Sequence, residues 1–85
     1  MAAKIVKQEG NNVVVEMESL TLANLLNEYL WNIRGVKFAG FVKEHPYLAK
    51  PKLLVSATDP KKALKTACEK ILKDIETLRK QIKKI

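Results

Sequence analysis

The chain has 85 residues, of which 47% are hydrophobic and 29% charged, and its net charge is +7. This length allows one domain with a thin core, so burial against a partner could supply part of its stability. The apolar content excludes a disordered chain, the lone Cys68 excludes an internal disulfide, and no cysteine–histidine set has zinc spacing. No apolar run reaches the length of a signal or membrane-spanning segment, so we expect a soluble, cytoplasmic domain over residues 1–85.

Most of the positive charge lies near the C-terminus. Residues 59–85 hold nine basic and four acidic side chains. Lysine and arginine gain affinity for nucleic acids by releasing counterions from phosphates, so a basic segment favours that kind of partner. Charged runs on a helix also simply keep the helix soluble, and composition leaves both interpretations open.

A β-hairpin is predicted at the N-terminus. The β-branched residues Ile5 and Val6 precede QEGNN, and three valines follow at 13–15. Gly10 and Asn11 can adopt the positive φ that a tight turn requires.

The next predicted element is a helix that starts after Ser19 or Thr21, either of which can cap it, and runs to about Asn32. Its apolar residues recur at three- and four-residue steps and predict the face that covers the sheet: Leu22, Leu25, Leu26, Tyr29, Leu30 and Ile33. At about 100° per residue, Asn24 and Trp31 fall on the opposite side, which favours a contact outside the domain. Packing of Trp31 under a neighbouring loop is the alternative.

Two more strands and a loop follow Gly35, which ends this helix. In residues 36–43, Val36, Phe38, Gly40 and Val42 alternate with Lys37, Ala39, Phe41 and Lys43, a period of two that predicts a strand with unequal faces. Residues 44–52 contain two prolines and predict a loop, and residues 53–57 predict the fourth strand. Asp59 before Pro60 then predicts a capped helix start.

The last helix, uninterrupted to Ile85, carries an apolar seven-residue repeat. Its members are Leu64, Cys68, Ile71, Ile75, Leu78, Ile82 and Ile85. Such a repeat keeps its register with a second helix over several turns. At roughly 1.5 Å per residue the helix is nearly 40 Å long, more than short strands cover, so we expect its far end to project and expose an interface. The alternative is a helix that packs entirely over its own sheet.

The predicted order is therefore β-β-α-β-β-α, a four-stranded antiparallel sheet with two helices in the α+β class. No residues suggest catalysis, a metal or a cofactor. His45 has no second histidine or nearby cysteine, and Cys68 lies on the apolar repeat, where cysteine behaves as a small hydrophobe. The glycines form no phosphate-binding loop, and the two phenylalanines form no base-stacking platform.

Three stretches, SLTLANLLNEYL, GVKFAGFVKEHPYLAKPKLLV and TDPKKALKTACEKI, resemble in order and spacing the family of subunit L of archaeal RNA polymerase. The resemblance covers residues 13–85. It implies the fold of the dimerisation domain of the bacterial polymerase alpha subunit, and no chemistry of the chain's own. The family has Asp-His before the threonine and glycine before the asparagine of its first helix, where this chain has Ser19, Leu20 and Ala23.

The resemblance also implies the partners. The first and last helices would pack against the equivalent helices of a larger alpha-like subunit, called D in archaea. The heterodimer would be a platform for the large catalytic subunits in transcription, and it would meet DNA only through the holoenzyme. The interface residues would be Asn24, Trp31, Leu64, Cys68, Ile71, Ile75, Leu78, Ile82 and Ile85.

Two functional hypotheses follow. The first is this non-catalytic assembly role within DNA-directed RNA polymerase. The second is a free-standing basic module that homodimerises through its last helix and binds nucleic acid through its lysines, with an affinity that falls steeply with salt. Lysines on both sides of the apolar repeat favour the first, because a DNA-binding module needs them on one face.

Overall fold

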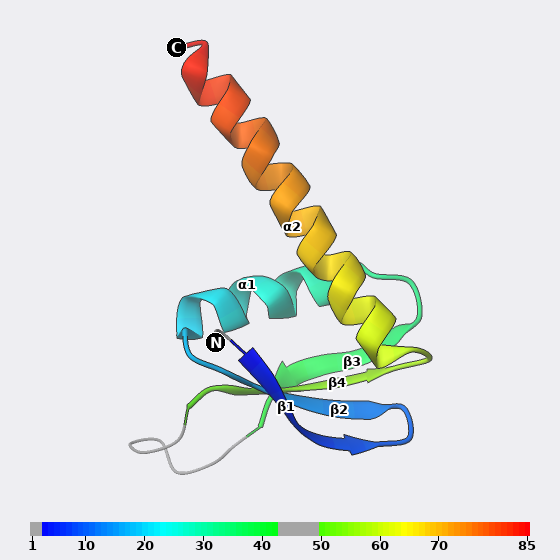
Figure 1. Cartoon of the computed structure of the whole chain (residues 1–85). Helices are drawn as coiled ribbons and strands as arrows, with labels where there is room; N and C mark the ends of the chain where they lie inside the picture. Colours follow the sequence, from blue (N-terminus) through cyan, green and yellow to red (C-terminus); the bar gives the residue numbers. More distant parts are fainter. Residues whose placement is uncertain (1–2, 43–49) are drawn as a thin grey trace.

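Six elements follow one another in the predicted order β-β-α-β-β-α (Figure 1), in a computed structural model that describes residues 3–42 and 50–85. They are β1 (Ala3–Glu9), β2 (Asn12–Met17), α1 (Leu20–Leu30), β3 (Val36–Phe41), β4 (Lys52–Ala57) and α2 (Pro60–Lys83). The helix α1 ends two residues before the predicted Asn32, and α2 ends two residues before the predicted Ile85. His45 and most of the predicted loop at 44–52 lie outside the described residues.

The strands form one antiparallel sheet in the order β1-β2-β4-β3. Consecutive β1 and β2 form the predicted hairpin, in which Gly10 has a φ of 55° while Asn11 keeps a negative φ. The central strands β2 and β4 pair Val13 with Val55 and Val15 with Leu53. Both helices lie on the same side of this sheet (Figure 1), so a single layer of core separates sheet and helices.

Both helix starts are capped as the sequence predicts. The Oγ of Ser19, one of the two predicted caps, accepts a hydrogen bond from the Leu22 N–H at 3.2 Å. Asp59 Oδ1 accepts one from the Lys62 N–H at 3.2 Å, and Pro60 occupies the first turn. These oxygens satisfy backbone donors that have no partner within the helix.

The buried face of α1 differs from the predicted one in part, because Leu26, Leu30 and Ile33 are buried as predicted but Leu22 is not. Ala23, Leu26 and Leu30 are the buried residues of the helix, whereas Leu22 remains 47% exposed. The helix is thus rotated so that Ala23, at 0% exposure, replaces Leu22 against the core. Because this position is fully buried in a packed core, a larger side chain such as leucine would overpack it.

The predicted alternation of β3 is also wrong at one point, because its register with β4 shifts between Val36 and Phe38. Val36 lies opposite Ala57, and Ala39 lies opposite Val55, so both face the helices. Phe38 lies opposite Ser56, on the face without helices. A β-bulge inserts one residue and so reverses the face of every residue beyond it.

The helix α2 covers the sheet with its first turns and then leaves it. Pro60, Ala63 and Ala67 are its buried residues, and every residue from Leu72 to Ile85 is exposed. The C-terminal half rises away from the sheet and from α1 (Figure 1). The predicted projection is confirmed, and the alternative of a helix packed entirely on its own sheet is wrong.

Candidate protein interface

The seven-residue repeat of α2, which we call the α2 seam, changes its environment along the helix. Leu64 and Ile71 are half-buried against the core, while Cys68 between them is exposed. Further along, the exposed fractions rise to 53% for Ile75, 55% for Leu78, 58% for Ile82 and 101% for Ile85. The far half of the seam therefore presents four large apolar side chains, each of which is at least half exposed.

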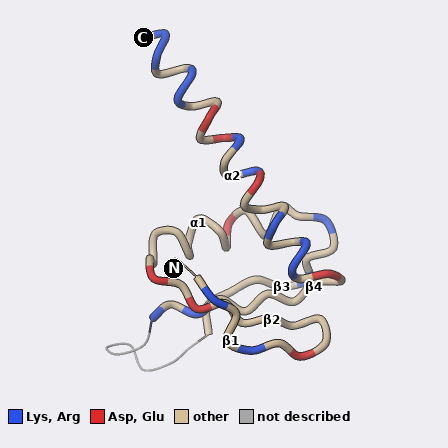
Figure 2. The backbone as a smooth tube through the Cα atoms, in the orientation of Figure 1, with Lys and Arg blue, Asp and Glu red and all other residues tan. Residues whose placement is uncertain are grey.

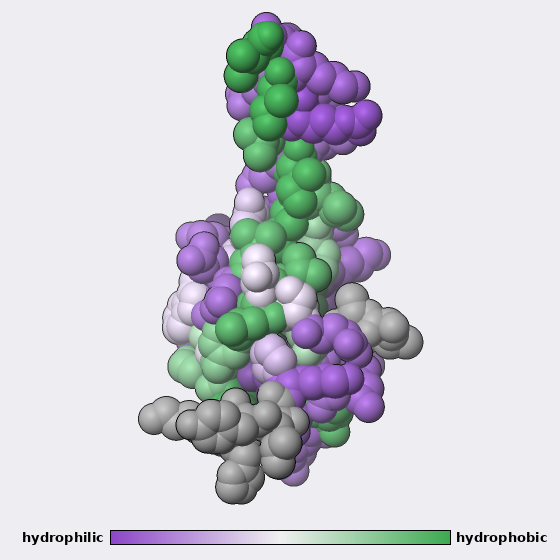
Figure 3. Space-filling view, turned by 90° about the vertical axis from the view of Figure 1, so that its left-hand side faces the viewer, coloured by the Kyte–Doolittle hydropathy of each residue, from purple (hydrophilic) through white to green (hydrophobic). Residues whose placement is uncertain are grey.

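The apolar surface extends beyond the α2 seam. Figure 3 shows a hydrophobic band that runs from the tip of α2 down to the body of the domain. Leu72, 67% exposed, is a further apolar residue on the projecting part of α2. The sequence reasoning missed Leu72 because it is not in the seven-residue repeat, although it lies four residues after Cys68. A helix surface this apolar is typical of a protein–protein contact.

Asn24 and Trp31 are both exposed on α1, as predicted, but they do not join the α2 seam. Trp31 packs instead on Phe38 at the edge of the sheet, with ring centroids 5.8 Å apart in a T-shaped arrangement at 82°. Tyr29, two residues earlier and so roughly 200° around the helix, lies on the side of α1 that faces α2 and hydrogen-bonds to it. Trp31 and the α2 seam lie on different sides of α1, so a single partner could contact both only by reaching around this helix. The contacts of Asn24 and Trp31 with a partner stay a prediction.

One hydrogen bond joins the two helices near the point where α2 leaves the body. The Tyr29 hydroxyl donates to Asp74 Oδ2 at 2.6 Å. This bond to the carboxylate raises the pKa of Tyr29 above its ordinary value, because it stabilises the protonated phenol, and partial desolvation acts in the same direction. The bond links α1 to the first projecting turns of α2 and so helps to set the angle at which the seam is displayed.

The charged side chains of α2 leave the seam apolar. Lysine and arginine residues are spread along the helix up to its C-terminal end (Figure 2). The projecting half holds Lys73, Arg79, Lys80, Lys83 and Lys84, and Arg79 forms an ion pair with Glu76 at 3.7 Å. Lys73, Lys80 and Lys84 lie on the opposite side of the helix from Leu78 at about 100° per residue. The helix is therefore amphipathic, with one side suited to a partner and the other to water.

Possible metal-binding side chains do not gather in the described residues. Within residues 3–42 and 50–85, no three metal-binding side chains come together, and Cys68 stands free on the surface of α2. Neither helix in this part of the chain is both long and apolar enough to cross a membrane. The apolar surface of α2 thus remains the strongest candidate for function.

Comparisons with known proteins agree on one family. Residues 11–81 match the family described as the RNA polymerase Rpb3/Rpb11 dimerisation domain. Two relatives are both named DNA-directed RNA polymerase subunit Rpo11. The protein from Methanothermobacter thermautotrophicus is 33% identical over 93% of each chain, and that from Thermococcus onnurineus is 42% identical over 84% of this chain and 82% of its own.

A solved structure is similar over nearly the whole chain. It is the crystal structure of DNA-directed RNA polymerase subunit L from Thermoplasma acidophilum, with a TM-score of 0.84 and 29% identity. The similarity covers 96% of this chain and 85% of that one. The fold predicted from the resemblance is therefore confirmed.

Proposed function

This chain belongs to the RNA polymerase Rpb3/Rpb11 dimerisation-domain family, and from that premise we propose that it is a non-catalytic assembly subunit of an archaeal DNA-directed RNA polymerase. It pairs with an alpha-like subunit of the kind called D in archaea. The heterodimer is the platform on which the large catalytic subunits assemble in the cytoplasm. DNA meets this subunit only as part of the holoenzyme.

The observation that carries this proposal is the exposed half of the α2 seam. Apolar side chains at 75, 78 and 82 follow a seven-residue repeat on a helix that extends beyond its own core, and Ile85 continues the repeat just past the end of the helix. A repeat of this kind stays in contact with a second helix that coils around it with a left-handed twist. The far half of α2 thus fits a helical partner better than a flat surface or a small molecule.

The arrangement of the two helices explains how the contact would work. The first turns of α2 are anchored by Pro60, Ala63 and Ala67, and the Tyr29–Asp74 hydrogen bond supports the helix where it leaves the body. The seam is therefore held in place before the partner arrives, so less conformational entropy is lost on binding. Dimerisation buries apolar surface that the isolated chain exposes to water.

The experiment is co-expression of the tagged chain with the alpha-like subunit of the same organism, followed by size-exclusion chromatography with light scattering. We expect a heterodimer with one copy of each chain, to which the large polymerase subunits bind in a second step. The chain expressed by itself is the control and should self-associate or aggregate through its exposed seam. A soluble homodimer that carries nucleic acid and ignores the alpha-like subunit would refute the proposal and restore the basic-module hypothesis.

A further inference from the structure

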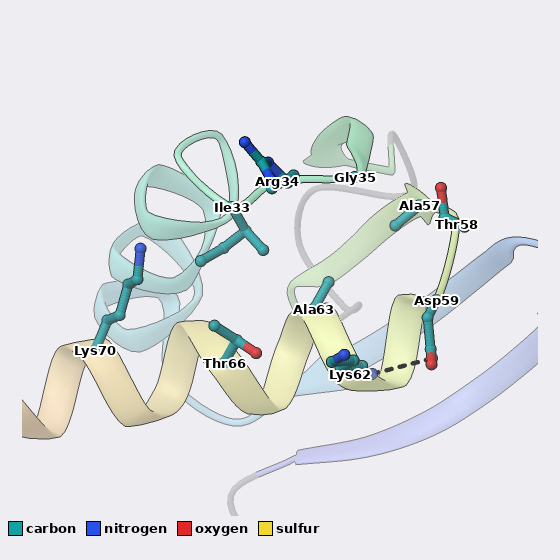
Figure 4. Close-up of a pocket in the computed structure, with 10 residues that line it drawn as sticks. All are labelled: Ile33, Arg34, Gly35, Ala57, Thr58, Asp59, Lys62, Ala63, Thr66 and Lys70. Atoms are coloured by element: carbon teal, nitrogen blue, oxygen red, sulfur yellow. Dashed lines mark hydrogen bonds between the residues drawn. The ribbon is translucent and has the colours of Figure 1, made fainter.

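A second surface feature lies on the other flank of α2. It is a cleft of about 420 Å³ between the turn that follows α1, the end of β4 and the first turns of α2 (Figure 4). Its apolar part includes Ile33, Ala57 and Ala63, and in the close-up Ile33 and Thr66 extend toward each other across the space. We call this feature the Arg34 cleft after the cation at its rim.

The charge of the Arg34 cleft is positive. Arg34, Lys62 and Lys70 line it, and among the described lining residues Asp59 is the one acid. The Asp59 carboxylate is already engaged, since it accepts the hydrogen bond of the Lys62 backbone N–H. None of the three cations forms an ion pair within residues 3–42 and 50–85. The N-terminal end of α2 adds a partial positive charge in the same place.

The Arg34 cleft and the α2 seam lie on different sides of α2. Thr66 in the cleft and Ile75 in the seam are nine residues apart, which is roughly half a turn at about 100° per residue. A helix that packs along the seam therefore leaves the cleft open. One subunit can hold both surfaces at the same time.

We propose that the Arg34 cleft docks an acidic segment of a polymerase subunit other than the seam partner. Carboxylates of that segment pair with Arg34, Lys62 and Lys70, since guanidinium and ammonium groups bind carboxylates through charge-assisted hydrogen bonds. An apolar side chain of the same segment covers Ile33 and Ala63. This apolar floor favours a protein segment over nucleic acid, whose phosphate backbone would leave it in water. The inference rests on the proposed function, because it assigns a further subunit to the same assembly.

Photo-crosslinking in the assembled polymerase tests this inference. The chain carries p-benzoylphenylalanine in place of Thr66, the polymerase is purified whole, and the crosslinked peptide is identified by mass spectrometry. Thr77 is the matched control, because it is exposed on the same flank of α2 three turns beyond the cleft. We expect position 66, and not 77, to crosslink to an Asp- or Glu-rich segment of a subunit other than the alpha-like one.

A charge variant then tests the chemistry of the cleft. The variant Arg34→Gln, Lys62→Gln and Lys70→Gln should lower the crosslink yield from position 66 roughly tenfold, since paired charges stabilise such contacts. The control variant Lys73→Gln, Lys80→Gln and Lys84→Gln removes three positive charges from the projecting helix and should leave the yield unchanged.

The outcomes separate this inference from the proposed function. A complex that retains the alpha-like subunit but gives no crosslink at position 66 overturns the cleft assignment and leaves the assembly role intact. Crosslinks to nucleic acid, or to the alpha-like subunit itself, also overturn it. Loss of the alpha-like subunit from the wild-type complex would instead contradict the proposed function.

Discussion

Replacing Ile75, Leu78 and Ile82 by alanine should weaken the heterodimer without unfolding the chain. The three side chains are 53%, 55% and 58% exposed, so about half of each remains to be buried by a partner. Full burial of such a side chain is worth about 1.5–3 kcal/mol, so the half left to the partner is worth about 1 kcal/mol each and about 3 kcal/mol together. Since 1.4 kcal/mol is a factor of ten, affinity should fall roughly 100-fold.

Competition for a limiting partner measures this loss directly. Wild-type and variant chains are co-expressed in equal amounts with a limiting, tagged alpha-like subunit, and mass spectrometry gives the ratio in which they are incorporated. The control variant Lys73→Ala, Lys80→Ala and Lys84→Ala changes the opposite side of α2. It should be incorporated as well as the wild type.

Two results would refute this reasoning. An incorporation ratio within about twofold of one, the range of ordinary surface substitutions, would show that the far half of the seam is not in the interface. A variant that loses its helical circular dichroism would show that the seam supports the fold of the chain itself. Alanine favours helix more than isoleucine does, so loss of α2 for reasons of propensity is not expected.

Three further substitutions test the fold that presents the interface. Leu30→Ala should lower the free energy of unfolding by about 3 kcal/mol in urea titrations, because Leu30 is fully buried and the change leaves a cavity; a loss below about 1 kcal/mol would contradict its place in the core. Ser19→Ala removes the acceptor of the Leu22 N–H and should cost about 1 kcal/mol, with faster amide exchange confined to the first turn of α1; unchanged exchange there would contradict the cap. Because the pKa of Tyr29 is raised, its hydrogen bond to Asp74 contributes stability below pH 10.0 and loses it as the pH rises through the raised pKa. Asp74→Ala should bring this pKa back toward 10.0 in a phenolate absorbance titration, with Tyr29→Phe as the blank, and an unchanged titration would refute the bond.

Local sequence signals predicted the elements and most of their limits. The hairpin glycine, the caps at Ser19 and Asp59, and the proline at the start of α2 act within a few residues of the chain. The seven-residue repeat is equally local, and together with the length of the helix it predicted that α2 extends beyond the sheet. These features can be derived from the chain because their energies depend on neighbours in sequence.

The faces of the elements depended on tertiary contacts. Periodicity placed Leu22 on the buried face of α1, but the spacing of apolar residues does not fix how far the helix is rotated about its axis. Packing against the rest of the core buried Ala23 and left Leu22 exposed. The bulge at Lys37 in β3 reversed the strand's faces, and neither of the flanking glycines, Gly35 and Gly40, stands at the bulge itself to predict it. Pairing with β4, which is distant in sequence, decides this register.

The functional surfaces also differ in whether the sequence or the tertiary structure determines them. The apolar α2 seam was determined by the sequence, because a repeat along one helix fixes which side chains share a side. The Tyr29–Asp74 bond and the Arg34 cleft were decided by the tertiary structure alone, since each joins residues from separate elements. Sequence spacing orders side chains along one element. The packing of α2 against α1 and the sheet, by contrast, places Arg34, Lys62 and Lys70 around one cleft and leaves the far half of α2 exposed.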